Sequence, residues 1–468
     1  MSKRSMGLGR MMEAISFILL LPLPFVPFFK GEYFILSSFL IPFFISILIS
    51  FTVDKLGIKF KSISSTVSFI WLYGFLVLSF PFLGSKNATF IGSLFESISG
   101  LTTTGLSILD VEKLPKTLLL YRAMLQYIGG LGFVMMILLF FNGREEAELY
   151  EAEGHVDRLK PNIRKTAKTI TIMYLSFLLL GSIEYKIAGM TMLDSVVHSM
   201  CALSTGGFSN RMLSIGAYDS LAIEIITSQL MILGTLDFSL LLTLLSGRIR
   251  DFFRSTEIKT FFSLLFIGSG LMILILLEKG YGVGSTFRIT LFNALSALST
   301  TGFSTLDYTT LPEGAVFVMI VLMIIGGGVG STAGGIKLER FYIIFKSTIK
   351  SIREKISPEG TVIVDKMVKG RESHIIEESE RNDAFSYFSL YLLFLIFGTI
   401  VLSTTEDCPI LYALFEYTSS LSTVGLSIGV TNPNTSPISL VLMMIAMIMG
   451  RLEMMVVFKA LFHKGKSL

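Results

Sequence analysis

The sequence has very little cysteine, histidine and charge. Its 468 residues include two cysteines and four histidines, and only 16% of the residues are charged. Cys201 and Cys408 are too few for a disulfide framework or a multi-thiolate metal site, and the scattered histidines show no paired spacing for a catalytic zinc. The first apolar run has no small-residue cleavage site, so no cleavable signal peptide is expected.

Hydrophobic residues are abundant instead. They make up 52% of the chain, and the mean hydropathy is +0.70, which is typical of a polytopic membrane protein. Ten spans are predicted, the eighth of them interrupted, at roughly 11–30, 33–52, 65–83, 116–141, 166–188, 218–246, 257–278, 313–350, 383–403 and 436–462. Four half-length apolar segments lie at about 88–101, 190–203, 287–298 and 409–421.

One short motif occurs four times. Aligned on its glycine, each copy has Leu at position −4, Thr at −2, a large apolar residue at +1 and Ser at +2. The copies are Leu101–Ser107, Leu203–Ser209, Leu298–Ser304 and Leu421–Ser427. Position −9 is always polar, with Glu96, His198, Asn293 and Glu416. Position −5 is always small, with Gly100, Ala202, Ala297 and Ser420. A spacing of about a hundred residues indicates a repeated helix–loop–helix unit with an insertion.

The predicted fold is therefore an all-α membrane protein with two extra N-terminal spans and four helix–P loop–helix repeats around one pore. The predicted divisions are 1–62 for the N-terminal pair and 63–143, 144–247, 248–355 and 356–468 for repeats 1 to 4.

Lysine and arginine predict the orientation. Most of the 39 basic residues fall in segments that share one side of the membrane when the N-terminus is inside. Both termini are then cytoplasmic in a cell membrane, and all four motifs face outward. Because the net charge of +4 is mostly this orientation signal, nucleic-acid binding is not expected.

The motif is suited to passing a cation. Non-helical backbone at membrane depth is tolerated only when it is buried in protein or lines water, and four such loops can turn carbonyls toward a shared pore. Glycine permits positive φ, threonine adds hydroxyls, and the helices end with their negative poles toward the centre. The candidate filter residues are Thr103, Thr104, Gly105, Thr205, Gly206, Gly207, Thr300, Thr301, Gly302, Thr423, Val424 and Gly425. A single copy would fit a plain turn or a tight helix contact, but four copies in register favour the pore.

Two further groups of polar residues are placed around this filter. Asp110 and Asp307 follow their glycines by five residues and are expected at the outer mouth, where they would raise the local cation concentration. The polar column at −9 is interpreted as an anchor behind the filter. The pattern assigns no place to Asp237.

The residues resemble the Trk/Ktr/HKT superfamily of potassium transporters. Thr423-Val424-Gly425 is the potassium-channel filter tripeptide, and the two extra spans with the stretches Gly326–Lys337 and Gly450–Glu453 are most similar to bacterial Trk uptake subunits of the TrkH type. Four filter glycines imply potassium as the transported ion, with no covalently bound cofactor; a sodium-coupled or sodium-permeable transporter is the alternative. The resemblance also implies a homodimer and a separate cytosolic nucleotide-binding ring protein of the NAD or ATP type.

A glycine-rich run interrupts the third repeat. Six glycines in the ten residues 326–335 are incompatible with a regular helix, and the run is out of register for a Walker loop. It resembles the intramembrane gating loop of the superfamily; a close-packing helix face is the alternative. Arg451 is expected to line the pore and hold this loop, unless Glu453 or a loop carbonyl simply neutralises it. The candidate gating residues are Gly326, Gly327, Gly328, Gly330, Ser331, Thr332, Gly334, Gly335 and Arg451.

Two other classes of function fit less well. A coupled transporter of another solute would have inverted halves and a midplane carboxylate, whereas these repeats are parallel. An intramembrane enzyme needs a nucleophile with its base or a metal pair, and His198 stands in a column otherwise filled by Glu and Asn. A non-enzymatic ion transporter is predicted. Whether its flux is passive or coupled to protons or sodium, and which nucleotide gates it, stays open.

Overall fold

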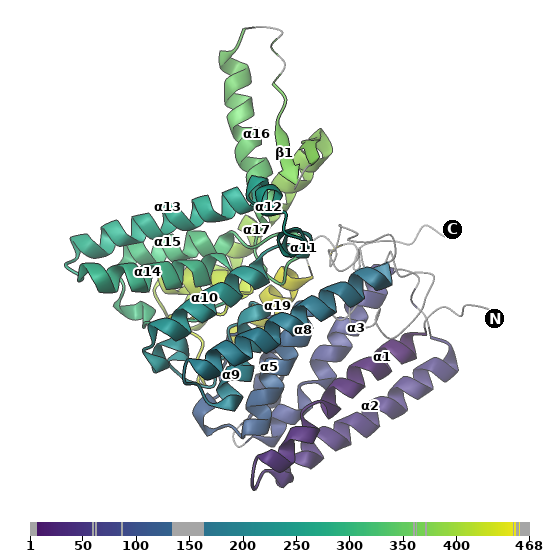
Figure 1. Cartoon of the computed structure of the whole chain (residues 1–468). Coiled ribbons are helices and arrows are strands. Elements are labelled where there is room, and N and C mark those ends of the chain that lie inside the picture. Colours follow the sequence, from purple (N-terminus) through teal and green to yellow (C-terminus); the bar gives the residue numbers. More distant parts are fainter. Residues whose placement is uncertain are drawn as a thin grey trace.

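The structure is a computed structural model that describes residues 7–58, 60, 63–85, 88–132, 163–358, 361, 363–369, 372–452, 454 and 458. Helices make up most of it (Figure 1). The chain begins with a helical hairpin of α1 (Leu8–Phe17) and α2 (Leu36–Leu56). Short 3-10 helices cover Ile18–Leu20, Leu23–Phe28, Tyr33–Ile35, Phe80–Gly84, Val111–Lys113, Ser214–Tyr218 and Tyr308–Thr310.

Each repeat then contributes a first helix, a pore helix and a second helix. The first helices are α3 (Ile63–Val77), α8 (Ile163–Ile187), α13 (Thr256–Glu278) and α17 (Glu378–Thr405). The pore helices are α4 (Phe90–Leu101), α9 (Met192–Leu203), α14 (Val283–Leu298) and α18 (Ile410–Leu421). The second helices are α5 (Lys116–Leu131), α10 (Leu221–Thr235), α15 (Glu313–Ile324) and α19 (Pro437–Arg451). As the half-length segments predicted, every pore helix ends at the motif leucine.

The four repeats close into a ring. The second helix of each repeat packs against the pore helix of the next, in the pairs α5 with α9, α10 with α14, α15 with α18 and α19 with α4. The N-terminal hairpin is fastened to this ring by Glu32. Its carboxylate accepts hydrogen bonds from the backbone N–H groups of Lys116 at 2.8 Å and Thr117 at 2.9 Å, which caps the first turn of α5.

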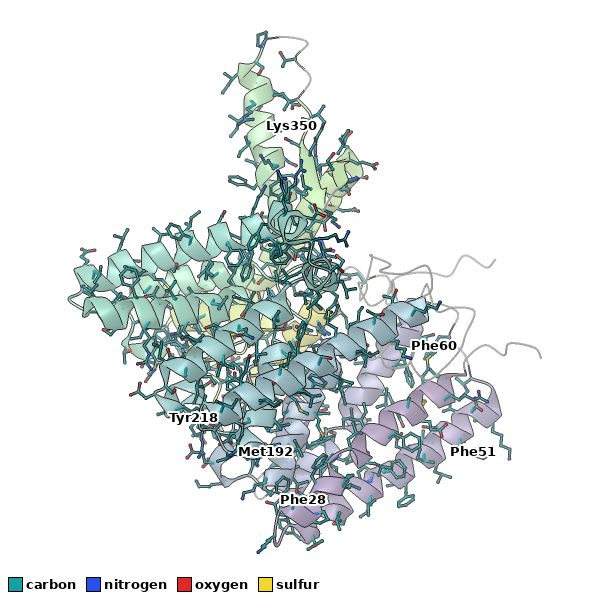
Figure 2. All side chains as sticks on the ribbon, in the orientation of Figure 1. Phe28, Phe51, Phe60, Met192, Tyr218 and Lys350 are labelled. Atoms are coloured by element: carbon teal, nitrogen blue, oxygen red, sulfur yellow. The ribbon has the colours of Figure 1, made fainter. Side chains whose placement is uncertain are left out.

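Among the described residues, six helical segments are long and apolar enough to cross a membrane, so this is a multi-pass membrane protein. They are Leu8–Phe28, Tyr33–Leu56, Ser65–Gly84, Lys165–Ile187, Thr256–Glu278 and Glu378–Thr405. Large apolar side chains point outward from the body, as at Phe28 (80% exposed) and Phe51 (67% exposed) (Figure 2). In a bilayer, lipid rather than protein covers such side chains.

The second helices differ from the predicted spans. They end within two residues of four equivalent glycines, namely Gly129, Gly234, Gly326 and Gly450. The predicted continuous span 218–246 is wrong, because α10 and α11 (Phe238–Leu245) form a pair bent by 114°. The predicted interruption of 313–350 is confirmed, since α15 ends at Ile324 and α16 (Leu338–Ile356) begins after the glycine-rich run. Residues 133–141 of the predicted span 116–141 lie outside the described residues.

A small projection stands beyond the helical body. It consists of α16 and an antiparallel hairpin of β1 (Lys366–Lys369) and β2 (Glu372–Ile375), near the short α12 (Ile249–Arg254) (Figure 1). The all-α prediction contained no such hairpin. Val368 N donates to Thr256 Oγ1 at 2.9 Å, and Lys369 Nζ lies 3.1 Å from Glu339 Oε2, so the hairpin contacts both α13 and α16.

One packing contact in the ring gives a stability prediction. A Cβ added at Gly398 of α17 would collide with the ring of Tyr417 in α18, whereas one added at Gly270 of α13 would meet nothing within 4 Å. We expect Gly398→Ala to destabilise the fold by about 1–3 kcal/mol through overpacking. Gly270→Ala is the matched control and should leave stability unchanged or raise it, because alanine favours helix. Thermal unfolding in detergent distinguishes them, and equal midpoints for both variants would contradict the prediction.

Candidate functional site

All four pore helices end in the same backbone turn. The residue at −1 donates its N–H to the carbonyl at −6, in the pairs Thr104 to Ser99, Gly206 to Cys201, Thr301 to Ser296 and Val424 to Ser419, at 2.8–3.0 Å. The residue at −2 takes a left-handed conformation, with φ of 57°, 51°, 54° and 51° at Thr103, Thr205, Thr300 and Thr423. This is the Schellman arrangement, but β-branched threonine occupies the place that glycine usually takes. Four strained threonines at one level indicate a functional constraint.

The motif glycines bring the four loops together around one axis. Gly105, Gly207, Gly302 and Gly425 also have positive φ, between 72° and 93°. A Cβ on each would collide with the −1 carbonyl of the next repeat, in the order Gly105 on Gly206, Gly207 on Thr301, Gly302 on Val424 and Gly425 on Thr104. The contacts close a ring, so four backbone carbonyls lie at one level around a shared centre.

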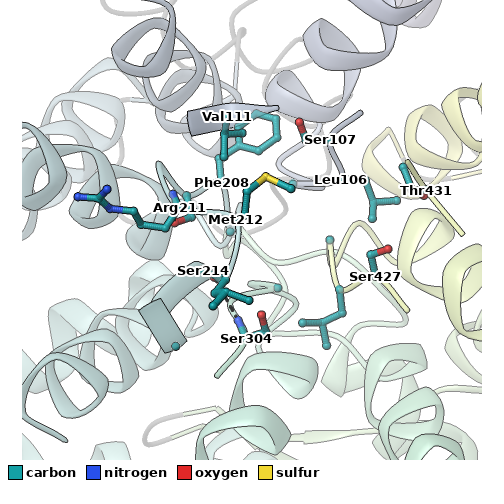
Figure 3. A pocket seen from close by; sticks show the side chains of 18 of the residues that line it. Leu106, Ser107, Val111, Phe208, Arg211, Met212, Ser214, Ser304, Ser427 and Thr431 are labelled. Carbon is teal, nitrogen blue, oxygen red and sulfur yellow. Dashed lines mark hydrogen bonds between the residues drawn. The ribbon is translucent and has the colours of Figure 1, made fainter. Parts of the chain in front are cut away.

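This ring forms the floor of an open cavity of about 680 Å³. In Figure 3 the four loops enter the cavity from four sides, with Ser107, Ser304 and Ser427 marking repeats 1, 3 and 4 and Phe208 marking repeat 2. The lining residues include all four motif glycines. The cavity therefore leads directly to the ring of carbonyls.

The polar column at −9 anchors the returning loops, as predicted. Glu416 Oε1 accepts from Ser427 Oγ at 2.7 Å and from Thr431 N at 3.0 Å, while Oε2 accepts from Ile428 N at 3.0 Å. Glu96 Oε1 likewise accepts from Ser107 Oγ at 2.6 Å, and a nitrogen of His198 lies 2.9 Å from Ser209 Oγ.

In repeat 3 the anchor reaches one residue further along the loop. Asn293 Nδ2 donates to Thr305 Oγ1 at 2.8 Å, at position +3 instead of +2. The hydrogen-bonding role of the column is therefore conserved among the repeats although the side chains differ.

A buried ion pair behind the ring was missed in the sequence. Arg122 of α5 is 2% exposed, its Nε lies 3.1 Å from Glu96 Oε2, and its guanidinium stacks 3.9 Å from the ring centroid of Phe208. It thus links the loops of repeats 1 and 2. The only available signal was an arginine within an apolar run, because the pairing depends on contacts between repeats.

The glycine-rich run lies directly against the threonine end of the ring. Gly334 N donates to Thr300 Oγ1 at 2.9 Å, and Thr332 Oγ1 lies 3.0 Å from Thr205 Oγ1. A Cβ on Gly334 would collide with Thr423 Oγ1. The segment therefore contacts three of the four motif threonines.

The ends of the run meet. Gly326 N donates to Ile336 O at 2.8 Å and Ile336 N donates to Ile324 O at 2.9 Å. The run is thus a loop that leaves the line of the helix and returns to it, and the alternative of a close-packing helix face is wrong.

Arg451 joins this loop to two other repeats. From the end of α19, its Nη1 donates to Thr332 O at 3.2 Å, and its Nη2 donates to Gly129 O and, at 3.2 Å, to Gly130 O. The predicted contact with loop carbonyls is therefore present. Glu453, the other suggested partner, lies outside the described residues.

Asp237 lies at the break in repeat 2. Its Oδ1 accepts from Ser239 N at 2.6 Å and caps α11. The carbonyls freed at the end of α10 accept hydrogen bonds from the loop: Gly328 N donates to Thr235 O at 3.0 Å, and Thr332 Oγ1 donates to Gly234 O at 2.9 Å. The break in α10 therefore supplies acceptors for the glycine-rich loop, which explains why the span is not continuous.

The comparisons with known proteins agree with this geometry. A family model described as cation transport protein, TrkH, matches residues 37–465. The chain belongs to the TrkH family. TrkG of Escherichia coli, a Trk system potassium uptake protein, is 30% identical over 437 residues, which are 89% of this chain and 88% of TrkG. An uncharacterized cation transporter of Methanocaldococcus jannaschii is 28% identical over 468 residues, 98% of this chain and 95% of the relative.

The fold of the TrkH family is also found in a solved structure. The crystal structure of the potassium transporter TrkH from Vibrio parahaemolyticus matches with a TM-score of 0.84 and 24% identity, and the match covers 98% of this chain and 97% of that one. Two of these proteins are named as transporters and TrkG as a potassium uptake protein, which supports the prediction that this chain is not an enzyme.

Asp307 and Asp110, the two acids expected at the outer mouth of the cavity, differ in position. Asp307 lines the cavity, and hydrogen bonds from the hydroxyl and the N–H of Thr309 lower the pKa of its carboxyl. Asp110 is 41% exposed and pairs with Lys113 at 2.6 Å; this hydrogen bond lowers its pKa. Both are ionised at neutral pH, but the charge of Asp110 is largely offset by its lysine.

The hydrogen bonds between Glu416 and the returning loop of repeat 4 give a testable prediction. Glu416→Ala removes the carboxylate that accepts from Ser427 Oγ, Ile428 N and Thr431 N, and each buried donor left without a partner costs about 1–3 kcal/mol. We expect a lower unfolding temperature and loss of ion flux in proteoliposomes. Glu416→Gln keeps one acceptor oxygen and should retain part of both. If Glu416→Ala behaved like the wild type, the anchor would have no role in holding the loop.

Proposed function

We propose that this chain takes up potassium ions across the cell membrane through a filter built from the four motif loops. The observation that carries the proposal is the closed ring in which each motif glycine approaches the −1 carbonyl of the next repeat. Carbonyl oxygens at one level replace the hydration shell of an alkali cation. The family membership and the names of the potassium uptake relatives point to the same ion.

The twelve filter residues have different roles in this proposal. The −1 and glycine positions present backbone carbonyls, and the −2 threonines add hydroxyls on the side of the glycine-rich loop. Asp307 would raise the cation concentration in the cavity, with a smaller contribution from Asp110 because Lys113 pairs with it. The motifs face outward and both termini are cytoplasmic, as the basic residues predict.

The glycine-rich loop is the proposed gate. It lies against the threonine end of the filter through Thr332 and Gly334, and Arg451 holds it from the fourth repeat. An ion that has passed through the ring of carbonyls would meet this loop next. Its conformational freedom is large, because Gly330 and Gly335 already have positive φ and carry no side chain.

Regulation is proposed to come from outside the chain. A homodimer with one pore per protomer would bind a cytosolic nucleotide-binding ring protein of the NAD or ATP type on the side of α16 and the β1–β2 hairpin. The name Trk system, which the potassium uptake relatives carry, fits a transporter with further components. The basic segment 144–168, a second candidate docking segment on the cytoplasmic side, lies largely outside the described residues.

Exchange of a filter glycine tests the pore. In Gly425→Ser or Gly105→Ser the side chain would collide with the carbonyl of Thr104 or of Gly206 and displace it. We expect the preference for potassium over sodium to fall by about tenfold or more, equivalent to about 1.4 kcal/mol, or flux to be lost. Flux from vesicles with defined ion gradients measures both ions. Wild-type preference in both variants would refute the filter, while high sodium flux in the wild type would favour the sodium-permeable alternative.

Shortening the loop tests the gate. Deletion of 330–334 removes Thr332 and Gly334, and with them the contacts under the filter. We expect partner-free proteoliposomes of this variant to conduct potassium several-fold faster than the wild type. Arg451→Ala should act in the same direction but less strongly, because it removes one anchor of the loop. Arg451→Lys, which keeps the charge, should lie between Arg451→Ala and the wild type. A folded, dimeric deletion variant with unchanged flux would mean that the loop only fills space.

A further inference from the structure

Repeat 2 differs from the others at position −1. Thr104, Thr301 and Val424 carry side chains there, whereas repeat 2 has Gly206. A Cβ on Gly206 would collide with the side-chain amide of Gln126, whose Oε1 would lie at 2.5 Å and Nε2 at 2.7 Å. Gln126 on α5 of repeat 1 therefore occupies the space into which a side chain at 206 would project.

Gln126 is fully buried and both ends of its amide are hydrogen-bonded to the loop of repeat 2. Nε2 donates to Gly206 O at 2.5 Å, and Oε1 accepts from Phe208 N at 3.1 Å. Only one orientation of the amide satisfies both bonds, because a carbonyl cannot donate and a backbone N–H cannot accept. The side chain thus clamps the backbone on both sides of Gly207.

The equivalent positions in the other repeats hold no such group. Gln126 lies three residues before Gly129, and the residues three before Gly234, Gly326 and Gly450 are methionines, all fully buried: Met231, Met323 and Met447. Methionine fills the same volume but offers no amide. The clamp is therefore particular to the interface between repeats 1 and 2.

The clamp makes the ring of −1 carbonyls unequal. Within the part of the chain that the structure describes, the carbonyls of Thr104, Thr301 and Val424 accept no hydrogen bond, whereas Gly206 O accepts one from Gln126. An amide N–H beside a carbonyl partly offsets its negative end and fixes its direction. A Gly-Gly backbone without this restraint would have more freedom than the other three loops.

We propose that Gln126 is a positioning residue that determines ion selectivity: it replaces the side chain that Gly206 lacks and fixes the Gly206 carbonyl in the ring. This inference rests on the proposed filter function. Without the clamp, the Gly206 carbonyl moves independently and the ring adapts to the smaller sodium ion. Selectivity therefore depends on a residue outside the four motifs.

Replacement of Gln126 by methionine, the residue at the equivalent positions of the other repeats, tests the inference. Gln126→Met keeps the volume and removes both hydrogen bonds, and Gln126→Glu keeps the shape and the acceptor but loses the donor to Gly206 O. We expect the ratio of potassium to sodium flux to fall about tenfold in Gln126→Met, the size expected for two net hydrogen bonds, and about threefold in Gln126→Glu, which loses one of them. Total cation flux should persist in both. Met447→Leu is the matched control at an equivalent position and should keep the wild-type ratio.

The outcomes separate this inference from the filter proposal. If Gly425→Ser lowers the ratio while folded Gln126→Met and Gln126→Glu keep it within twofold of the wild type, the filter stands and the role of Gln126 is refuted. If Gly425→Ser also keeps the ratio, the filter itself fails.

A pair of compensating substitutions at Gly206 and Gln126 tests the contact between these residues if Gln126→Met does not fold. Gly206→Ala should abolish flux, because its Cβ collides with Gln126, and Gly206→Ala combined with Gln126→Ala should recover flux by removing the collision. Recovered flux with a reduced potassium to sodium ratio supports the inference. Normal flux in Gly206→Ala alone would overturn it, as would a double variant that regains the wild-type ratio.

Discussion

The structure depends on the close approach of each motif glycine to a backbone carbonyl of the next repeat. No other residue fits at Gly105, Gly207, Gly302 or Gly425, because φ is positive and a Cβ would occupy the position of the neighbouring oxygen. Four like dipoles at one level repel each other, so the loops need support from behind. The polar column at −9 supplies it, with buried hydrogen bonds to the returning chain at every repeat.

On the other side of the ring, the glycine-rich loop is likewise supported by buried hydrogen bonds. A loop inside the membrane needs partners for its polar backbone, and here they come from three repeats: Thr300 Oγ1, the freed carbonyls of Gly234 and Thr235, and the guanidinium of Arg451. These hydrogen bonds are few and specific, and they hold the loop in one place. Loss of a small number of them would free it, which fits the proposed role of the loop as a gate.

Patterns that recur in register were predictable from the sequence, and contacts between repeats were not. The ends of the pore helices and the anchor column follow from positions that the repeats share. The contact of Arg451 with the loop follows instead from its place in an apolar span, where an arginine needs polar partners. The 114° bend between α10 and α11 was not predictable, because every second helix carries an equivalent glycine and ends within two residues of it. It forms where the loop of repeat 3 contacts the carbonyls of α10. Arg122 and Gln126 were missed for the same reason, since each acts on the loop of a neighbouring repeat.

Four repeats in one chain are free to diverge, and the divergence is concentrated around the ring. In repeat 3 the break after the second helix is extended into the glycine-rich loop. Repeat 4 contributes Arg451, and repeat 1 contributes Gln126 at the place where repeat 2 has Gly206. A homotetramer would place each of these groups four times around the axis, and four arginines below one ring would exclude cations by charge alone. A single arginine and a single amide avoid that repulsion. In the proposed filter, each would therefore adjust one carbonyl or one loop while the remaining carbonyls stay available to the ion.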